Sequence, residues 1–115
     1  MLCDVLADPL EALATELRSK TSVDIVPGDI TARDYPDKIL ATLSARKIGL
    51  LAHTAGVSPS MANGKRVFEI NFSATDQLVS RLLPHMAPGG VAVLIVSNAG
   101  QLIARPLFEA RSRRS

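Results

Sequence analysis

The stretch IGLLAHTAG, residues 48–56, decides the fold. Apart from Gly49, its first five residues are apolar, which predicts a short buried strand over residues 48–52. The strand runs directly into His53 and a turn of small residues that ends at Gly56. Glycine lets another backbone or a ligand approach closely. A buried strand with this ending therefore indicates a site rather than an ordinary connection.

Three helices are predicted around this strand. The first begins at Asp8, which acts as the N-cap while Glu11 completes a capping box, and the second begins at Pro36. The third covers about residues 65–86 and ends before Pro88-Gly89-Gly90. The inward positions recur at spacings of three and four and are Leu10, Leu13, Leu17, Ile39, Leu40, Leu43, Val67, Ala74, Leu78 and Leu82.

Four strands are predicted, over residues 1–3, 23–26, 48–52 and 91–96. The last contains no polar residue, so we expect helices to cover both of its faces, as in a parallel sheet. Alternating strands and helices predict an α/β fold: a partial Rossmann-like, doubly wound parallel sheet of three to four strands with flanking helices. Residues 1–104 form this domain, and residues 105–115 form a basic C-terminal tail.

Composition excludes several classes of protein. The chain has 115 residues, of which 47% are hydrophobic and 21% charged, as expected of one globular domain. Aromatic residues make up 3% and tryptophan is absent, which argues against a base-stacking surface for nucleic acid. Binding of nucleic acid through the arginine-rich tail stays as a third alternative, and it would weaken steeply with salt.

The expected location is the cytoplasm. Cys3 is the single cysteine, so an internal disulfide is excluded and a reducing compartment is indicated. The opening MLCDVLADP shows no signal peptide, and no apolar run approaches the ~20 residues of a membrane helix.

Polar and small residues follow each predicted strand. They are Asp4 after the first, residues 27–31 after the second, residues 53–56 after the third and residues 97–100 after the fourth. In doubly wound sheets, ligands bind at the carboxyl ends of the strands. These four segments are therefore the candidate ligand site.

Together the segments resemble the short-chain dehydrogenase/reductase family over roughly residues 1–100. Gly28-Asp29-Ile30-Thr31 resembles its Asp-x-Thr element, and Thr54-Ala55-Gly56 resembles the end of its Asn-Asn-Ala-Gly turn. Ile70-Asn71-Phe72 is similar to its Val-Asn-Leu element, and the segment from Ser97 to Gly100 is similar to Ser-x-x-Gly. The short segment between Gly56 and Asn71 resembles the branch with 3α-hydroxysteroid dehydrogenases and carbonyl reductases.

The resemblance implies an oxidoreductase that uses NAD(H) or NADP(H) on a small-molecule alcohol or carbonyl, including hydroxysteroid-type substrates, and that can be a homo-oligomer. It implies no membrane or nucleic-acid partner. The cofactor-binding residues would be Asp4, Asp29, Ile30, Thr54, Ala55 and Gly56, and the catalytic positions Ser97 and Asn71. Asp4 would bond both ribose hydroxyls, which favours NAD over NADP.

Each of these residues also has a structural interpretation. Asp4 can be an acid at the approach to a helix, and Ser97 can cap the end of a strand. Asn71 falls on the apolar stripe of its helix, where an amide needs a hydrogen-bond partner.

His53 has the chemistry of a general base or a metal ligand. Only His85 and Cys3 could join it, and neither has a metal-ligand spacing. A hydrolytic triad of Ser97, His53 and Asp29 would rest on residue types alone.

Two family elements are missing from the sequence. The loop Thr-Gly-x-x-x-Gly-x-Gly, which holds the pyrophosphate, occurs nowhere. The Tyr-x-x-x-Lys pair expected downstream of Ser97 is absent, because Tyr35 is the only tyrosine and Lys65 the last lysine. General acid–base chemistry needs a group within reach of the substrate oxygen, so we expect an internal fragment that is inactive as this chain alone. The alternative is a non-catalytic α/β module that binds a nucleotide or another protein.

A missing central strand also has a structural consequence. In the strand order that the family resemblance implies, 3-2-1-4-5-6-7, the first strand lies between the second and the fourth. Without it, either the sheet closes up or two strand edges stay unpaired. In the second case we expect low stability or self-association.

Overall fold

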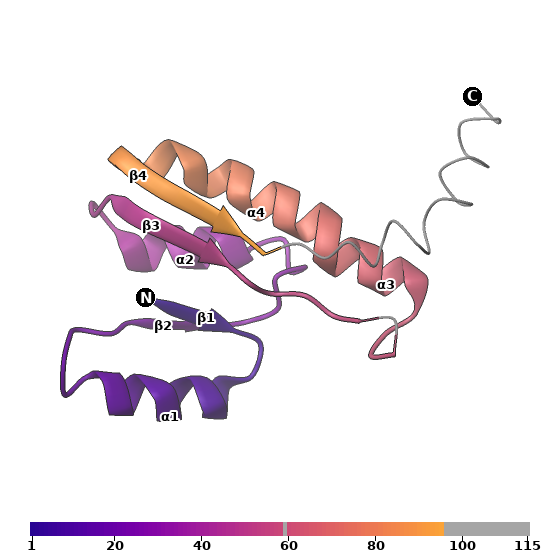
Figure 1. Cartoon of the computed structure of the whole chain (residues 1–115), viewed down its shortest axis with the longest axis horizontal. Helices are drawn as coiled ribbons and strands as arrows, with labels where there is room; N and C mark the ends of the chain where they lie inside the picture. The colour runs from indigo at the N-terminus through magenta and orange to yellow at the C-terminus, as the bar shows by residue number, and fades with distance from the viewer. Residues whose placement is uncertain (59, 96–115) are drawn as a thin grey trace.

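Strands and helices alternate as the sequence predicts (Figure 1). The structure, a computed structural model, describes residues 1–58 and 60–95. The strands are β1 (Leu2–Asp4), β2 (Ile25–Pro27), β3 (Ile48–His53) and β4 (Met86–Leu94). The helices are α1 (Ala7–Leu17), α2 (Tyr35–Leu43), α3 (Gly64–Phe68) and α4 (Thr75–Leu82), with a π-helix at Glu69–Ala74 and a 3-10 turn at Leu83–His85. The predicted tail and Ser97 lie outside the described residues.

The strands form two parallel pairs, β1 with β2 and β3 with β4. The predicted α/β fold with parallel strands and flanking helices is confirmed, but the described strands do not form one continuous sheet. Within residues 1–58 and 60–95, β1 and β3 do not pair, so the sheet has not closed up. In Figure 1 the pair of β3 and β4 lies above the pair of β1 and β2. Counting the described strands alone, each keeps one edge without a strand partner.

The predicted long helix is present as one helical run from α3 to α4 that contains a π-helical turn, and the strand after it begins earlier than expected. The chain passes from α3 through the π-helix to α4, and β4 starts at Met86 rather than at Val91. Pro88-Gly89-Gly90, predicted to stop the helix, lies inside β4. The β3–β4 register shifts there, and Gly89 has a φ of 75°. A glycine with a left-handed backbone lets a strand bulge and continue. The three residues therefore lie inside the strand instead of separating it from the helix.

The start of α1 also differs from the prediction. The helix begins at Ala7, its N-cap is Leu6, and no side chain caps it, so Asp8 is not the N-cap. Instead Asp4 Oδ1 accepts a hydrogen bond from the Leu6 N–H at 2.9 Å. Leu10 is buried as predicted, whereas Leu13 is exposed. The helix turns its narrow apolar face towards β1 and β2, and Leu13 falls outside it.

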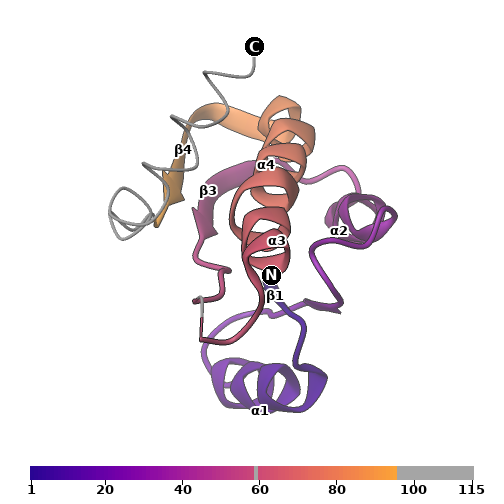
Figure 2. The same cartoon turned by 90° about the vertical axis from the view of Figure 1, so that its right-hand side faces the viewer.

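The core lies where α2 and α4 pack against the strands (Figure 2). Its buried members are Val26, Tyr35, Ile39, Leu78 and Leu82. The Tyr35 hydroxyl donates a hydrogen bond to the Val26 carbonyl at 2.6 Å, and burial raises the pKa of the phenol. The only tyrosine of the chain is therefore a core residue that the apolar pattern did not identify.

One face of the β3–β4 pair is open. Leu50 is 64% exposed and Val91 is 54% exposed. The prediction that both faces of the last strand are covered is therefore wrong for the part of β4 that the structure describes. An apolar strand is usual inside a parallel sheet because helices cover it. Among the described residues, α2 and α4 lie on one side only (Figure 2).

No helix in the described part of the chain is both long and apolar enough to span a bilayer.

Candidate functional site

The loop after β2 is organised around the carboxylate of Asp29. Its Oδ1 accepts hydrogen bonds from the Thr31 N–H at 2.8 Å and from the Thr31 hydroxyl at 2.7 Å. This is an Asx-type turn, in which an aspartate binds the backbone two residues further on. The two bonds from Thr31, followed by the contact with Arg66, lower the pKa of Asp29. The carboxylate is thus held ionised in a fixed orientation.

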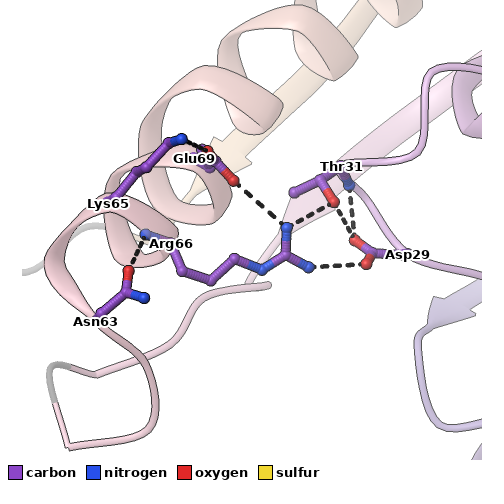
Figure 3. Close-up of polar contacts among 6 residues, drawn as sticks. All are labelled: Asp29, Thr31, Asn63, Lys65, Arg66 and Glu69. Atoms are coloured by element: carbon purple, nitrogen blue, oxygen red, sulfur yellow. Dashed lines mark hydrogen bonds and ion pairs between the residues drawn. The ribbon is translucent and has the colours of Figure 1, made fainter.

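Arg66 joins this loop to the helix that follows β3 (Figure 3). Its Nη2 binds Asp29 Oδ2 at 2.8 Å, and its Nη1 binds the Thr31 hydroxyl oxygen at 3.0 Å. Asn63 caps α3 by accepting a hydrogen bond from the Arg66 N–H at 2.9 Å. Glu69 Oε2 lies 3.5 Å from Nη1. Three side chains, Asp29, Thr31 and Glu69, therefore meet at the guanidinium, which links segments 37 residues apart in sequence.

The direction of each hydrogen bond in this cluster follows from its chemistry. An arginine side chain only donates, so the Thr31 oxygen must accept from Arg66. The Thr31 hydroxyl hydrogen is then directed to Asp29 Oδ1. The chain of bonds runs from Arg66 through Thr31 to Asp29, and each bond polarises the next.

The loop after β3 is held by Asn71 from the π-helix. The side chain accepts from the Val57 N–H at 2.8 Å through Oδ1 and donates to the Val57 carbonyl at 2.7 Å through Nδ2. A Cβ at Gly56 would lie 3.2 Å from the same Oδ1, which is a tight contact. The small residue at position 56 thus leaves room for this amide.

Asn71 was predicted on the apolar stripe of a continuous helix, and this is wrong: the residue is exposed, on a π-helical turn. The predicted need for a hydrogen-bond partner is met by Val57. A π-helical turn inserts an extra residue in the helix and so changes which side chains face the core. The prediction from periodicity assumed a regular α-helix, so it could not reveal the π-helical turn.

His53, at the end of β3, faces the same helical segment. Its Nε2 lies 2.8 Å from the Thr75 hydroxyl oxygen, and that hydroxyl donates to the Ile70 carbonyl at 3.2 Å. Because the Thr75 hydrogen is used, His53 Nε2 carries the proton and donates it. The side chain is buried, and burial lowers the pKa of the imidazole. His53 is therefore a neutral residue that holds β3 against the helix.

The other predicted cofactor residues lie along the carboxyl ends of the strands. Asp4 ends β1, and its carbonyl accepts from the Gly28 N–H at 2.9 Å, so the ends of β1 and β2 are adjacent. Ile30 packs against the core, while Thr54 and Ala55 are exposed after β3. Ser97 lies outside the described residues, so its predicted role and the triad with His53 and Asp29 are untested.

A shallow cavity lies beside this cluster in the described part of the chain. It has a volume of about 170 Å³ and is lined by Thr31, Glu69, Ser73, Ala74 and Gln77. Ligand pockets are usually about 300–1,000 Å³. The described part of the chain thus provides polar anchors but does not enclose a dinucleotide. Within that part, no three His, Cys, Asp or Glu residues are close enough together to hold a metal ion.

Arg66 is the residue of this site that the sequence did not reveal. Its partners lie far away in the chain, and a single arginine in a helix is usually a solvated surface residue. No local pattern could have identified it. Arg66 can be identified only once the fold places α3 beside the loop after β2.

Comparison with known structures agrees with this geometry. A short-chain dehydrogenase/reductase of the glucose/ribitol dehydrogenase type from Brucella melitensis superposes with a TM-score of 0.74 and 24% identity, over 90% of this chain and 48% of that one. A carbonyl reductase from Pseudomonas aeruginosa PAO1 gives 0.68 and 23%, over 95% and 57%. The RhlG/NADP active-site complex of Pseudomonas aeruginosa gives 0.68 and 24%, over 85% and 42%. The likeness concerns the fold, and the chain spans about half the length of these structures.

A search of curated proteins finds no match. The family profile of the short chain dehydrogenases, in contrast, matches residues 1–109, which is nearly the whole sequence. With the parallel strand pairs, the small turn at Gly56 and the amide of Asn71, this match completes the assignment. The chain belongs to the short chain dehydrogenase family.

Proposed function

We propose that this chain carries the adenosine side of a nicotinamide dinucleotide site. One observation carries the proposal. Arg66 and Asn71 lie on one continuous helical segment, and each holds the loop at the end of a different strand, Arg66 after β2 and Asn71 after β3. Carboxyl ends of neighbouring parallel strands are where such folds bind nucleotides. In Figure 1 the arrowheads of β3 and β4 point towards the side of the molecule that carries α3.

The residues of this edge suit the parts of the cofactor. The ionised carboxylate of Asp29 is an acceptor for the adenine amino group, and Ile30 offers an apolar contact beside it. Asp4, at the end of β1, suits the ribose hydroxyls and favours NAD(H) over NADP(H), since a carboxylate repels a 2′-phosphate. The small exposed turn Thr54-Ala55-Gly56 leaves space beside the backbone for the second ribose.

When bound, the nicotinamide would supply or accept a hydride. We propose that this chain alone does not complete that reaction, because residues 98–115 contain neither a tyrosine nor a lysine. Asn71 would contribute by holding the turn after β3, and Ser97 would orient a small-molecule alcohol or carbonyl substrate, with hydroxysteroids included among the candidates. A cytoplasmic location and assembly into a homo-oligomer belong to the same proposal.

Calorimetric titration with NADH, NADPH and AMP tests the binding. We expect AMP and NADH to bind, NADPH to bind more weakly, and Asp29→Asn to weaken AMP by roughly tenfold, as for loss of one hydrogen bond to a charged group. Asp37→Asn, which removes an exposed carboxylate on α2, is the matched control. Absence of AMP binding by the folded wild type would refute the proposal.

A reduction assay tests the catalytic part. Oxidation of NADH in the presence of a small ketone or a ketosteroid should not exceed the buffer rate. Turnover would show that a group other than a tyrosine donates the proton, and it would overturn the inactive assignment.

A second candidate is a protein-interaction module. The observation that favours it is the open face of β3 and β4, where Leu50 and Val91 are exposed. Exposed apolar patches mark interaction sites. If this is the function, the chain should self-associate or bind a partner without binding AMP.

A further inference from the structure

The carboxylate of Asp29 is nearly saturated by donors from its own chain. Oδ1 accepts two hydrogen bonds from Thr31, and Oδ2 accepts one from Arg66. A carboxylate offers about four lone-pair sites. Among the described residues, the remaining site is therefore on Oδ2, next to the guanidinium. One further N–H donor can be accepted there.

Arg66 determines where that remaining site points. Its fork engages Asp29 and Thr31 with two different nitrogens, so the carboxylate cannot rotate without breaking a second contact. A third acceptor also holds the fork, since Glu69 Oε2 lies 3.5 Å from Nη1. The backbone of Arg66 is anchored separately, because Asn63 accepts a hydrogen bond from its N–H. A planar guanidinium held by several acceptors is a rigid element, unlike a lysine ammonium.

We propose that Arg66 is a positioning residue that makes the site selective for a purine bearing an amino group. This inference rests on the proposed function. The fixed carboxylate accepts an N–H from the exocyclic amine of adenine. It repels the carbonyl oxygen that hypoxanthine carries at the same position. Arg66 does not touch the ligand in this scheme, and it acts through the orientation of Asp29.

The ratio of affinities for AMP and IMP measures this role. The two nucleotides share ribose and phosphate and differ at the amino or carbonyl group of the base. A merely structural role of Arg66 would weaken both ligands alike and leave the ratio unchanged. We expect the wild type to prefer AMP by about tenfold, as for one hydrogen bond to a charged group.

Arg66→Met should reduce this preference to about threefold or less, because the carboxylate becomes free to rotate. Arg66→Lys keeps the charge but lacks the planar fork, so the preference should be intermediate. Arg81→Met is the matched control, since Arg81 forms a comparably exposed ion pair with Asp37 between α4 and α2, away from the loop after β2. Its preference should equal that of the wild type.

The outcomes separate the two proposals. If the wild type binds no AMP, the proposed function fails and the role of Arg66 fails with it. If the wild type prefers AMP and Arg66→Met keeps the same ratio, only the role of Arg66 is overturned. If Arg66→Met does not fold, Arg66→Lys gives the decision: a wild-type ratio in the lysine variant would refute a need for the fork.

Discussion

The side chain of Asn71 binds both the N–H and the carbonyl of Val57, at 2.8 and 2.7 Å. It thereby takes the place of a backbone partner for the loop after β3. The same amide limits the size of residue 56. The motif Ile70-Asn71-Phe72 and the turn that ends at Gly56 therefore form one structural unit.

Asn71→Asp should destabilise the protein and free the loop, because a carboxylate cannot donate to the Val57 carbonyl and an acceptor would face an acceptor. We expect a loss of about 1 kcal/mol, the usual size of one hydrogen bond. Hydrogen exchange at the Val57 amide and urea unfolding measure it. Asn63→Asp is the control: that side chain only accepts, so its cap should survive. Equal effects of both variants would contradict the role of the Asn71 amide.

Tyr35→Phe should lower the free energy of unfolding by about 1–2 kcal/mol, because it leaves the buried Val26 carbonyl without its partner. Denaturant unfolding monitored by circular dichroism measures the change. A neutral result would mean that water replaces the hydroxyl.

Gly28→Ala should destabilise by about 1–3 kcal/mol, as is usual for overpacking. The added Cβ would lie 2.7 Å from Cδ2 and Cε2 of Tyr35, and the ring cannot move while its hydroxyl holds Val26. Gly49→Ala, where nothing lies within 4 Å of the added carbon, is the control. The two variants should differ in unfolding midpoint, and identical midpoints would contradict the close packing at Gly28.

His53 should make the protein less stable in mild acid. Burial lowers the pKa of the folded imidazole below its ordinary value near 6.5, so the unfolded chain binds the proton more readily. The contribution of His53 is fully present above that value and is lost as the pH falls through the folded pKa. His53→Gln, which can still donate to Thr75, should flatten this part of the pH profile, and an unchanged profile would contradict the role of His53. Unfolding by urea at several pH values gives the comparison.

The open face of β3 and β4 should drive self-association. Leu50→Lys adds a charge at its most exposed leucine and should shift the protein towards monomer in sedimentation velocity. Met61→Lys, at a comparably exposed apolar residue outside the strands, should leave association unchanged. A monomeric wild type would refute the prediction.

The alternation of elements and the inward face of α2 could be predicted from the sequence. Ile39 and Leu43 repeat at helical spacing, and β-branched or apolar runs mark the strands, so each signal is local. The segments that resemble the family were also recognisable, because each directly follows a strand. The predicted element boundaries were wrong at Asp8 and at Pro88-Gly89-Gly90. At the first, tertiary contacts override the local capping rule, and at the second a bulge lets the strand continue.

The fold class, the family resemblance and the chemical types at each strand end could all be read from the amino-acid sequence. Which of those groups meet depends on the three-dimensional packing of the elements. Arg66 and Asp29 are 37 positions apart, and their contact exists because α3 lies beside the loop after β2. The π-helical turn decided that Asn71 turns to Val57 instead of the core. Such contacts depend on how elements pack, and packing energy is shared among residues that no short window of sequence contains.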